Sequence, residues 1–291
     1  MRKVKSGISF LISFIMMLLL LVAMGMLFFM YGIGNEKLYF EVVKDNKTVD
    51  DIYEGVNDKL KYVMLSNNIP ESVVNNIITK DEVEDSVFTT VSNVLDYIEG
   101  NNNSIKQFDS SIYSERLIEA IKSQLTENGV ALTPEVLEVL DEIKESANDI
   151  IDSEVENIDV SKISSSSYST KIQKIVAIMT NKTYFLSIIG VYIVLAIALM
   201  IMWRKSITRA FSWIGYSSLS SGALVLVVGL SGYISKFYNN IALTSETLKE
   251  NISSIIQRYF ITLSTIGGIF AIVGIFFVLL YWIHLVKKNN R

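Results

Sequence analysis

Long apolar runs alternate with mixed polar segments along the chain, and they predict where it crosses a membrane. Four stretches contain no Asp, Glu, Lys or Arg: residues 6–35, 183–203, 210–235 and 259–286. Each is longer than the roughly 20 residues, at about 1.5 Å rise per residue, that a helix needs to cross the hydrocarbon core. The pattern therefore predicts four membrane-spanning helices, at about 8–31, 184–203, 210–234 and 259–286.

We expect the first apolar run to be an uncleaved anchor and not a signal peptide. It is about 24 residues long, whereas the apolar part of a signal peptide usually has about 7–15 residues. Ala23 and Gly25 lie inside the run and make a poor cleavage site.

Basic residues next to the spans predict which side of the membrane each end faces. They precede the first span, separate the second span from the third, and follow the fourth. These residues are Arg2, Lys3 and Lys5; Arg204, Lys205 and Arg209; and Lys287, Lys288 and Arg291. Because short basic segments stay in the cytoplasm, we expect a multi-pass plasma-membrane protein with both termini cytoplasmic and residues 36–182 extracellular.

The segment between the first two spans has the periodicity of amphipathic helices. Its apolar residues recur every three or four positions, and the alternation typical of strands never lasts. Helices are expected to begin near Thr48, Pro70, Thr79, Ser110 and Pro134. Thr79 with Glu82 matches a capping box, and Thr48 is expected to cap its helix in a similar way.

Charge separates this segment from the rest of the chain. Residues 36–182 hold 28 acidic and 14 basic residues, whereas the remainder holds two acidic and twelve basic ones. We interpret the acids as a solvated surface, and the fold as all-α with a helical extracellular domain inserted between spans one and two.

The predicted parts are 1–34 (cytoplasmic N-terminus and first span), 35–163 (acidic helical domain), 164–183 (Ser-rich linker and juxtamembrane helix) and 184–291 (spans two to four with a basic C-terminus).

Small residues on the third and fourth spans predict a close helix-packing seam. Its members are Gly222, Gly229, Ser264, Gly267, Ala271 and Gly274. Small side chains let helix backbones approach, and serines can bond across the interface. Since the third span also carries six serines, the alternative interpretation is a Ser-lined pore or lipid groove built by a homo-oligomer.

Two apolar stripes predict a stalk beside the membrane. One precedes the second span and the other precedes the fourth: Ile172, Val176 and Met179, then Leu248, Ile252 and Ile255. Neither stripe has Gly or Pro before its span, so each is expected to continue its helix outward. The stripes would face each other or the domain; the alternative is that both lie flat on the lipid surface.

Composition excludes most catalytic chemistry. The chain has no Cys, which removes disulfides, thiol nucleophiles and thiolate metal sites. His284 is the only histidine, and no acidic residue lies within the spans to serve it as a proton partner. We therefore expect a non-enzymatic protein without catalytic, cofactor or metal residues, and without a nucleic-acid partner.

Two short motifs in the acidic segment carry a resemblance. They are the run from Lys59 to Val74, followed by Ile78-Thr79, and the GVALTP sequence from Gly129 to Pro134. With the four-span layout, they resemble uncharacterised multi-pass membrane proteins of low-GC Gram-positive bacteria. The use of 39 Ile and 11 Ala agrees with an AT-rich source. The layout also resembles, in topology alone, the FtsX-type permease subunits.

Two functions fit these features. The first is a non-enzymatic cell-envelope protein in the lipid bilayer, whose extracellular domain binds a protein partner or senses a condition. The alternative is a membrane permeation or export component, either permease-like or an oligomeric pore, that uses the Ser-rich third span.

Overall fold

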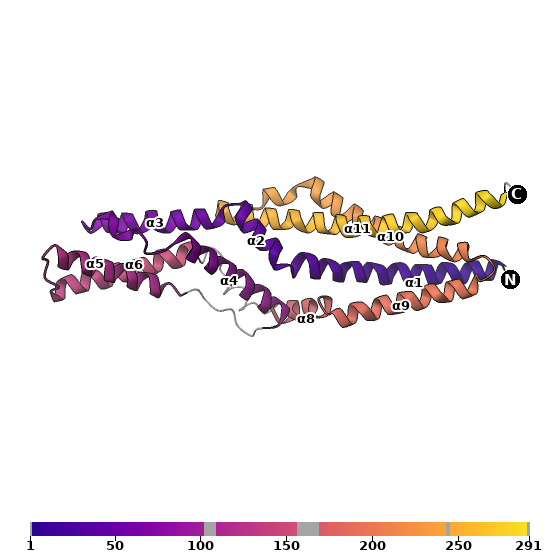
Figure 1. Cartoon of the computed structure of the whole chain (residues 1–291), viewed down its shortest axis with the longest axis horizontal. Coiled ribbons are helices and arrows are strands. Elements are labelled where there is room, and N and C mark those ends of the chain that lie inside the picture. The colour runs from indigo at the N-terminus through magenta and orange to yellow at the C-terminus, as the bar shows by residue number, and fades with distance from the viewer. Residues whose placement is uncertain (1, 102–108, 156–168, 243–244, 290–291) are drawn as a thin grey trace. The chain divides into compact units, whose positions relative to one another are not determined.

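The computed structural model describes residues 2–101, 109–155, 169–242 and 245–289. Within these residues every regular element is helical, which confirms the predicted all-α fold (Figure 1). The α-helices are α1 (Arg2–Phe28), α2 (Glu36–Asp45), α3 (Thr48–Ser66), α4 (Lys80–Glu99), α5 (Ser111–Glu127), α6 (Pro134–Val155), α8 (Ser169–Met179), α9 (Lys182–Met202), α10 (Ile207–Ser235) and α11 (Glu246–Asn289). Short π- and 3₁₀-helices are η1 (Phe29–Ile33), η2 (Glu71–Val74) and η3 (Phe237–Asn240).

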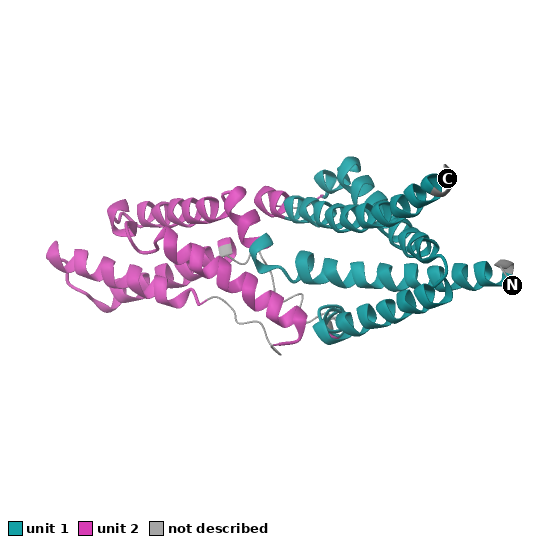
Figure 2. Cartoon of the chain, turned by 45° about the vertical axis from the view of Figure 1, so that its right-hand side comes forward, with its two compact units in different colours: residues 1–38, 171–241, 252–291 teal, residues 39–170, 242–251 magenta. Residues whose placement is uncertain are grey.

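The chain divides into two compact units, coloured separately in Figure 2. Unit 1 comprises residues 1–38, 171–241 and 252–291, and unit 2 comprises residues 39–170 and 242–251. Residues 242–251, which the sequence places between the third and fourth spans, belong to unit 2. The predicted Ser164–Ser167 linker lies outside the described residues.

Unit 1 contains the long apolar helices that the sequence predicted. Four helices among the described residues are long and apolar enough to cross a membrane: Val4–Ile33, Lys182–Met202, Ile207–Ser235 and Glu246–Lys287. The first of them ends in the π-helical turn η1, where the Gly34 N–H donates to the Phe29 carbonyl over 2.7 Å. A turn of this kind widens the helix and lets the chain change direction into α2.

The core of unit 2 lies between α3, α4, η2, α5 and α6. Its fully buried side chains come from the apolar stripes that the periodicity predicted, and include Val56, Leu60, Met64, Leu117, Ile121 and Ile151. The short η2 begins after Pro70 and buries both Val73 and Val74, as expected. The acidic faces of these helices point to solvent, and hydrophobic burial stabilises the unit.

Local end signals explain where several helices begin and stop. At α4 the Thr79 hydroxyl accepts from the Glu82 N–H while the Glu82 carboxylate accepts from the Thr79 N–H, which confirms the capping box. Gly100 ends α4 with φ of 80°, in the left-handed region that glycine adopts without strain.

The predicted cap at Thr48 was wrong. Lys47, with φ of 54°, precedes α3, and no side-chain cap bond is present there. Thr48 is instead the first residue of the helix, with only 3% of its surface exposed. Its hydroxyl bonds to a residue far away in the sequence, and a local sequence pattern cannot predict a contact of that kind. The sequence also did not predict α2, which precedes this turn.

Candidate functional site

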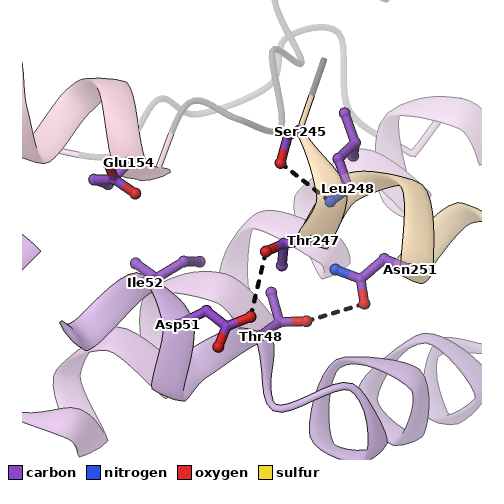
Figure 3. A pocket seen from close by; sticks show the side chains of 8 residues that line it. All are labelled: Thr48, Asp51, Ile52, Glu154, Ser245, Thr247, Leu248 and Asn251. Carbon is purple, nitrogen blue, oxygen red and sulfur yellow. Dashed lines mark hydrogen bonds between the residues drawn. The ribbon is translucent and has the colours of Figure 1, made fainter. Parts of the chain in front are cut away.

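A small polar pocket in unit 2 is the candidate site (Figure 3). It has a volume of about 140 Å³ and is formed where the start of α3, the end of α6 and the start of α11 meet. Its lining residues are Thr48, Asp51, Ile52, Glu154, Ser245, Thr247, Leu248 and Asn251. Residues from opposite ends of the sequence therefore share one site.

Side-chain hydrogen bonds fasten the start of α11 to α3 in this pocket. The Asn251 amide oxygen accepts from the Thr48 hydroxyl and from the Asn46 amide, each over 2.9 Å. The Thr247 hydroxyl donates to an Asp51 carboxylate oxygen over 3.3 Å (Figure 3). Since Thr48 is buried, its hydroxyl would lose a needed acceptor if α11 moved away.

The two carboxylates of the pocket have different partners. Glu154 forms an ion pair with Lys59 of α3 and lies against Gly55, where an added Cβ would come within 3.0 Å of a carboxylate oxygen. Asp51 has a hydroxyl partner but no cationic partner among the described residues. Gly55 thus makes room for α6 to end against α3.

The hydrogen bonds of this pocket attach the start of α11 to α3. The Thr48 hydroxyl donates to the Asn251 amide oxygen, and the Thr247 hydroxyl donates to the Asp51 carboxylate. Among the described residues, no group of three His, Cys, Asp or Glu side chains is placed to hold a metal ion. The pocket therefore works as a joint between the first turns of α11 and the helices of unit 2.

The structure brings the predicted seam residues together across α10 and α11. A Cβ added to Gly222 would collide with the Ala271 backbone nitrogen, and one on Gly229 would lie 2.5 Å from the Ser264 hydroxyl. Gly267 faces the Leu226 backbone, and Gly274 faces that of Leu219. Backbone therefore packs directly on backbone along this seam.

Most of the serine hydroxyls of α10 donate hydrogen bonds to backbone carbonyls of the same helix. Ser217 donates to the Ile214 carbonyl and Ser221 to the Ser217 carbonyl, each over 2.8 Å. Ser218 reaches across the seam and donates to the Phe270 carbonyl of α11, also over 2.8 Å. These three serines are buried.

The predicted stalk residues are placed on two different surfaces. The stripe of α8 turns toward α1: Val176 is buried, and the Met179 methyl lies 3.6 Å from where a Cβ on Gly25 would be. Ile252 and Ile255 lie on α11 and are half-buried. Leu248 belongs to the pocket.

Helix continuity before the spans holds for one stripe and fails for the other. The helix α11 continues without interruption from Glu246, as expected. Between α8 and α9 the helix breaks, because the Asn181 side chain accepts from the N–H groups of Thr183 and Tyr184 and begins a new helix. The sequence prediction missed this asparagine cap, although Asn is a favoured residue at such a position.

Comparison of the chain with protein-family models, with curated proteins and with solved structures finds no match.

Proposed function

We propose that this chain is a non-enzymatic membrane protein whose helical unit 2 receives a signal, by binding a partner or responding to a condition outside the cell. The helix α11 then carries that signal into a bundle formed by the four apolar helices. The proposal places these helices across the plasma membrane, with unit 2 on the extracellular side.

The observation that carries this proposal is the continuity of α11. Its 44 residues form one helix, whose first turns belong to unit 2 and whose remainder belongs to unit 1. Asn251 and Thr247 are hydrogen-bonded into the pocket, and the next residue, Ile252, already belongs to the other unit. A continuous helix is stiff, so displacement of its first turns passes along its length.

The seam offers a way for such a displacement to change the bundle. Gly222 and Gly267 lie against backbone atoms of the facing helix, so the two helices are in close contact and a shift of α11 changes how their backbones pack. Packed interfaces of this kind tend to switch between discrete arrangements. Movement of α11 would therefore select a different packing of α10 and α11.

The permeation alternative has less support. A polar pathway needs hydroxyls that face an open lumen, but Ser217, Ser218 and Ser221 are buried and donate to backbone carbonyls. Ser220 and Ser231 of α10 are exposed, so few hydroxyls of this helix are left to line such a lumen.

Because the chain has no Cys, a single fluorophore can report on the far end of α11. We would attach it to His284→Cys in full-length protein in nanodiscs. The artificial ligands would be monovalent antibody fragments selected against the whole chain and mapped to α5 or α6. We expect fragments that bind there to change the emission of the fluorophore and the hydrogen exchange of α10 and α11.

Two glycines inserted after Gln257 should abolish this response while the fragments still bind. The same insertion after Lys287, beyond the reporter, is the matched control and should preserve it. Two results would contradict the proposal. One is a panel of fragments that bind unit 2 without changing the emission of the fluorophore, and the other is an emission change that persists after the insertion at Gln257.

A further inference from the structure

Four basic side chains gather at one end of unit 1, where a short turn joins α9 to α10. They are Lys5 of α1 and Arg204, Lys205 and Arg209 of the turn and the first residues of α10, and we name them the basic turn. Lys5, Arg204 and Lys205 are exposed, and Arg209 is half-buried.

Specific contacts hold this group in place. The Lys5 ammonium lies 3.4 Å from the Met202 carbonyl at the end of α9. The Trp203 indole N–H donates to the buried Ser9 hydroxyl over 2.8 Å, which ties the turn to α1. The Arg209 guanidinium stacks 5.2 Å above the Trp203 ring. Lys5 and Arg209 are therefore held by contacts of their own, and the Trp203–Ser9 bond ties the turn that carries Arg204 and Lys205 to α1.

These cations have no acidic partner in their own unit. Glu36 is the only acidic residue in the sequence of unit 1, and it stands at the opposite end of α1 from Lys5. Six ion pairs of the chain, among them Lys44–Glu84 and Arg116–Glu82, lie in unit 2 and leave the basic turn untouched. The basic turn is therefore a concentration of positive charge that an anion from another molecule can meet without competition from an acid of its own unit.

The start of α10 adds to this positive potential. The first turn of α10 contains no acid, and Ser206 makes no side-chain cap bond to its N–H groups. Helix N-termini carry a partial positive charge, so Arg209 in the first turn meets an unfavourable field that an anion would relieve. A phosphate group suits both the backbone N–H groups and the guanidinium.

Apolar side chains next to the basic turn identify the source of that phosphate. Ile201 and Val4 are 66% and 64% exposed, and Ile207 and Ile8 are also exposed. Such residues favour an occupant that carries hydrocarbon as well as phosphate, because hydrocarbon is the partner that they lack. We propose that the basic turn binds the headgroup phosphate of an anionic phospholipid, whose acyl chains cover these apolar faces. This assignment rests on the membrane placement proposed above.

The test uses full-length protein purified in a neutral detergent. Phosphatidylglycerol should raise its melting midpoint more than phosphatidylcholine does, and inorganic phosphate should not reproduce the effect. In Arg204→Gln/Lys205→Gln, both exposed positions, the apparent affinity for phosphatidylglycerol should fall roughly tenfold or more, because each basic residue near an anionic surface contributes to attraction. Native mass spectrometry would count the lipids retained by each form.

The matched control is Lys174→Gln/Lys182→Gln, which also removes two exposed cations. Lys182 is the first residue of α9, at the end away from the basic turn, and Lys174 lies in α8. It should keep the phosphatidylglycerol response. An equal loss in both double variants, no loss in the first, or an equal effect of inorganic phosphate would overturn the lipid site. Retention of the wild type in membranes after a carbonate wash tests the membrane placement separately. A protein that stays in the membrane but shows no lipid preference would therefore contradict the lipid site alone, whereas a protein released by the wash would contradict the membrane placement.

Discussion

The hydroxyl of Thr48 donates a 2.9 Å hydrogen bond to the side-chain oxygen of Asn251, although 203 positions separate the two residues in the sequence. The Asn46 amide donates to the same oxygen. One acceptor on the second turn of α11 thus satisfies two donors at the entrance of α3. This cluster keeps the first turns of α11 attached to unit 2.

We predict that Asn251→Leu will loosen the start of α11. The change leaves the buried Thr48 hydroxyl and the Asn46 amide without their acceptor, at a cost of about 1–3 kcal/mol. Hydrogen exchange in the first turns of α11 should accelerate accordingly. Thr48→Val removes one donor and keeps the shape, so its effect should be smaller, about 1 kcal/mol. Thr126→Val is the control, because that hydroxyl bonds only within α5; an equal effect there would contradict the joint.

Acid should weaken unit 2 through Glu82. Burial favours its neutral form, but hydrogen bonds from Arg116 and from Thr79 outweigh burial and hold the pKa of Glu82 below its ordinary value of 4.5. A lowered folded pKa stabilises the protein above the unfolded value, and this stability is lost as pH falls through the folded pKa. We expect the Glu82 contribution to fade below about pH 4.5.

The measurement is the melting midpoint of Glu82→Gln against wild type across acidic pH. At neutral pH the variant should be less stable by about 1 kcal/mol, since glutamine retains the cap but loses the charged bond to Arg116. The difference should shrink as pH falls. Asp85→Asn, an exposed position on the same helix, should show no comparable effect; a constant difference for Glu82→Gln would rule out this account.

Features set by local sequence were predictable. A capping box needs only Thr79 and Glu82 three positions apart, and an apolar run defines a candidate span by its length alone. The side chains that face the core of unit 2 followed from spacing, because an amphipathic helix buries the same face in most folds.

Features set by tertiary contact were not predictable. The sequence marked Thr48 as a local cap, yet its hydroxyl is used by Asn251 across the chain. Nothing local distinguishes Asn251 from the many other polar residues of the α10–α11 region. The break at Asn181 was readable as a cap, but the apolar stripes on both sides favoured a continuous helix. The pocket depends on three helices meeting, which periodicity does not encode.

Neighbouring glycines on α11 should respond differently to an added methyl group. A Cβ on Gly267 would collide with the Leu226 backbone, whereas one on Gly268 meets only a Leu226 methyl at 4.0 Å. Gly267→Ala should therefore destabilise the α10–α11 seam by about 1–3 kcal/mol, and Gly268→Ala should be nearly neutral. Melting in detergent compares the two. Equal midpoints would show that the helices do not pack at this register.

Orientation in the membrane should follow the charge asymmetry of the chain. Twelve basic and two acidic residues lie outside 36–182, and short basic segments remain cytoplasmic. We expect Tyr62→Cys, at a position 73% exposed in unit 2, to react with an impermeant maleimide on intact cells. Lys205→Cys, exposed in the basic turn, should react only after permeabilisation. The reverse pattern would invert the topology, and labelling of both sites on intact cells would mean that α9, the apolar helix between them, does not cross the bilayer.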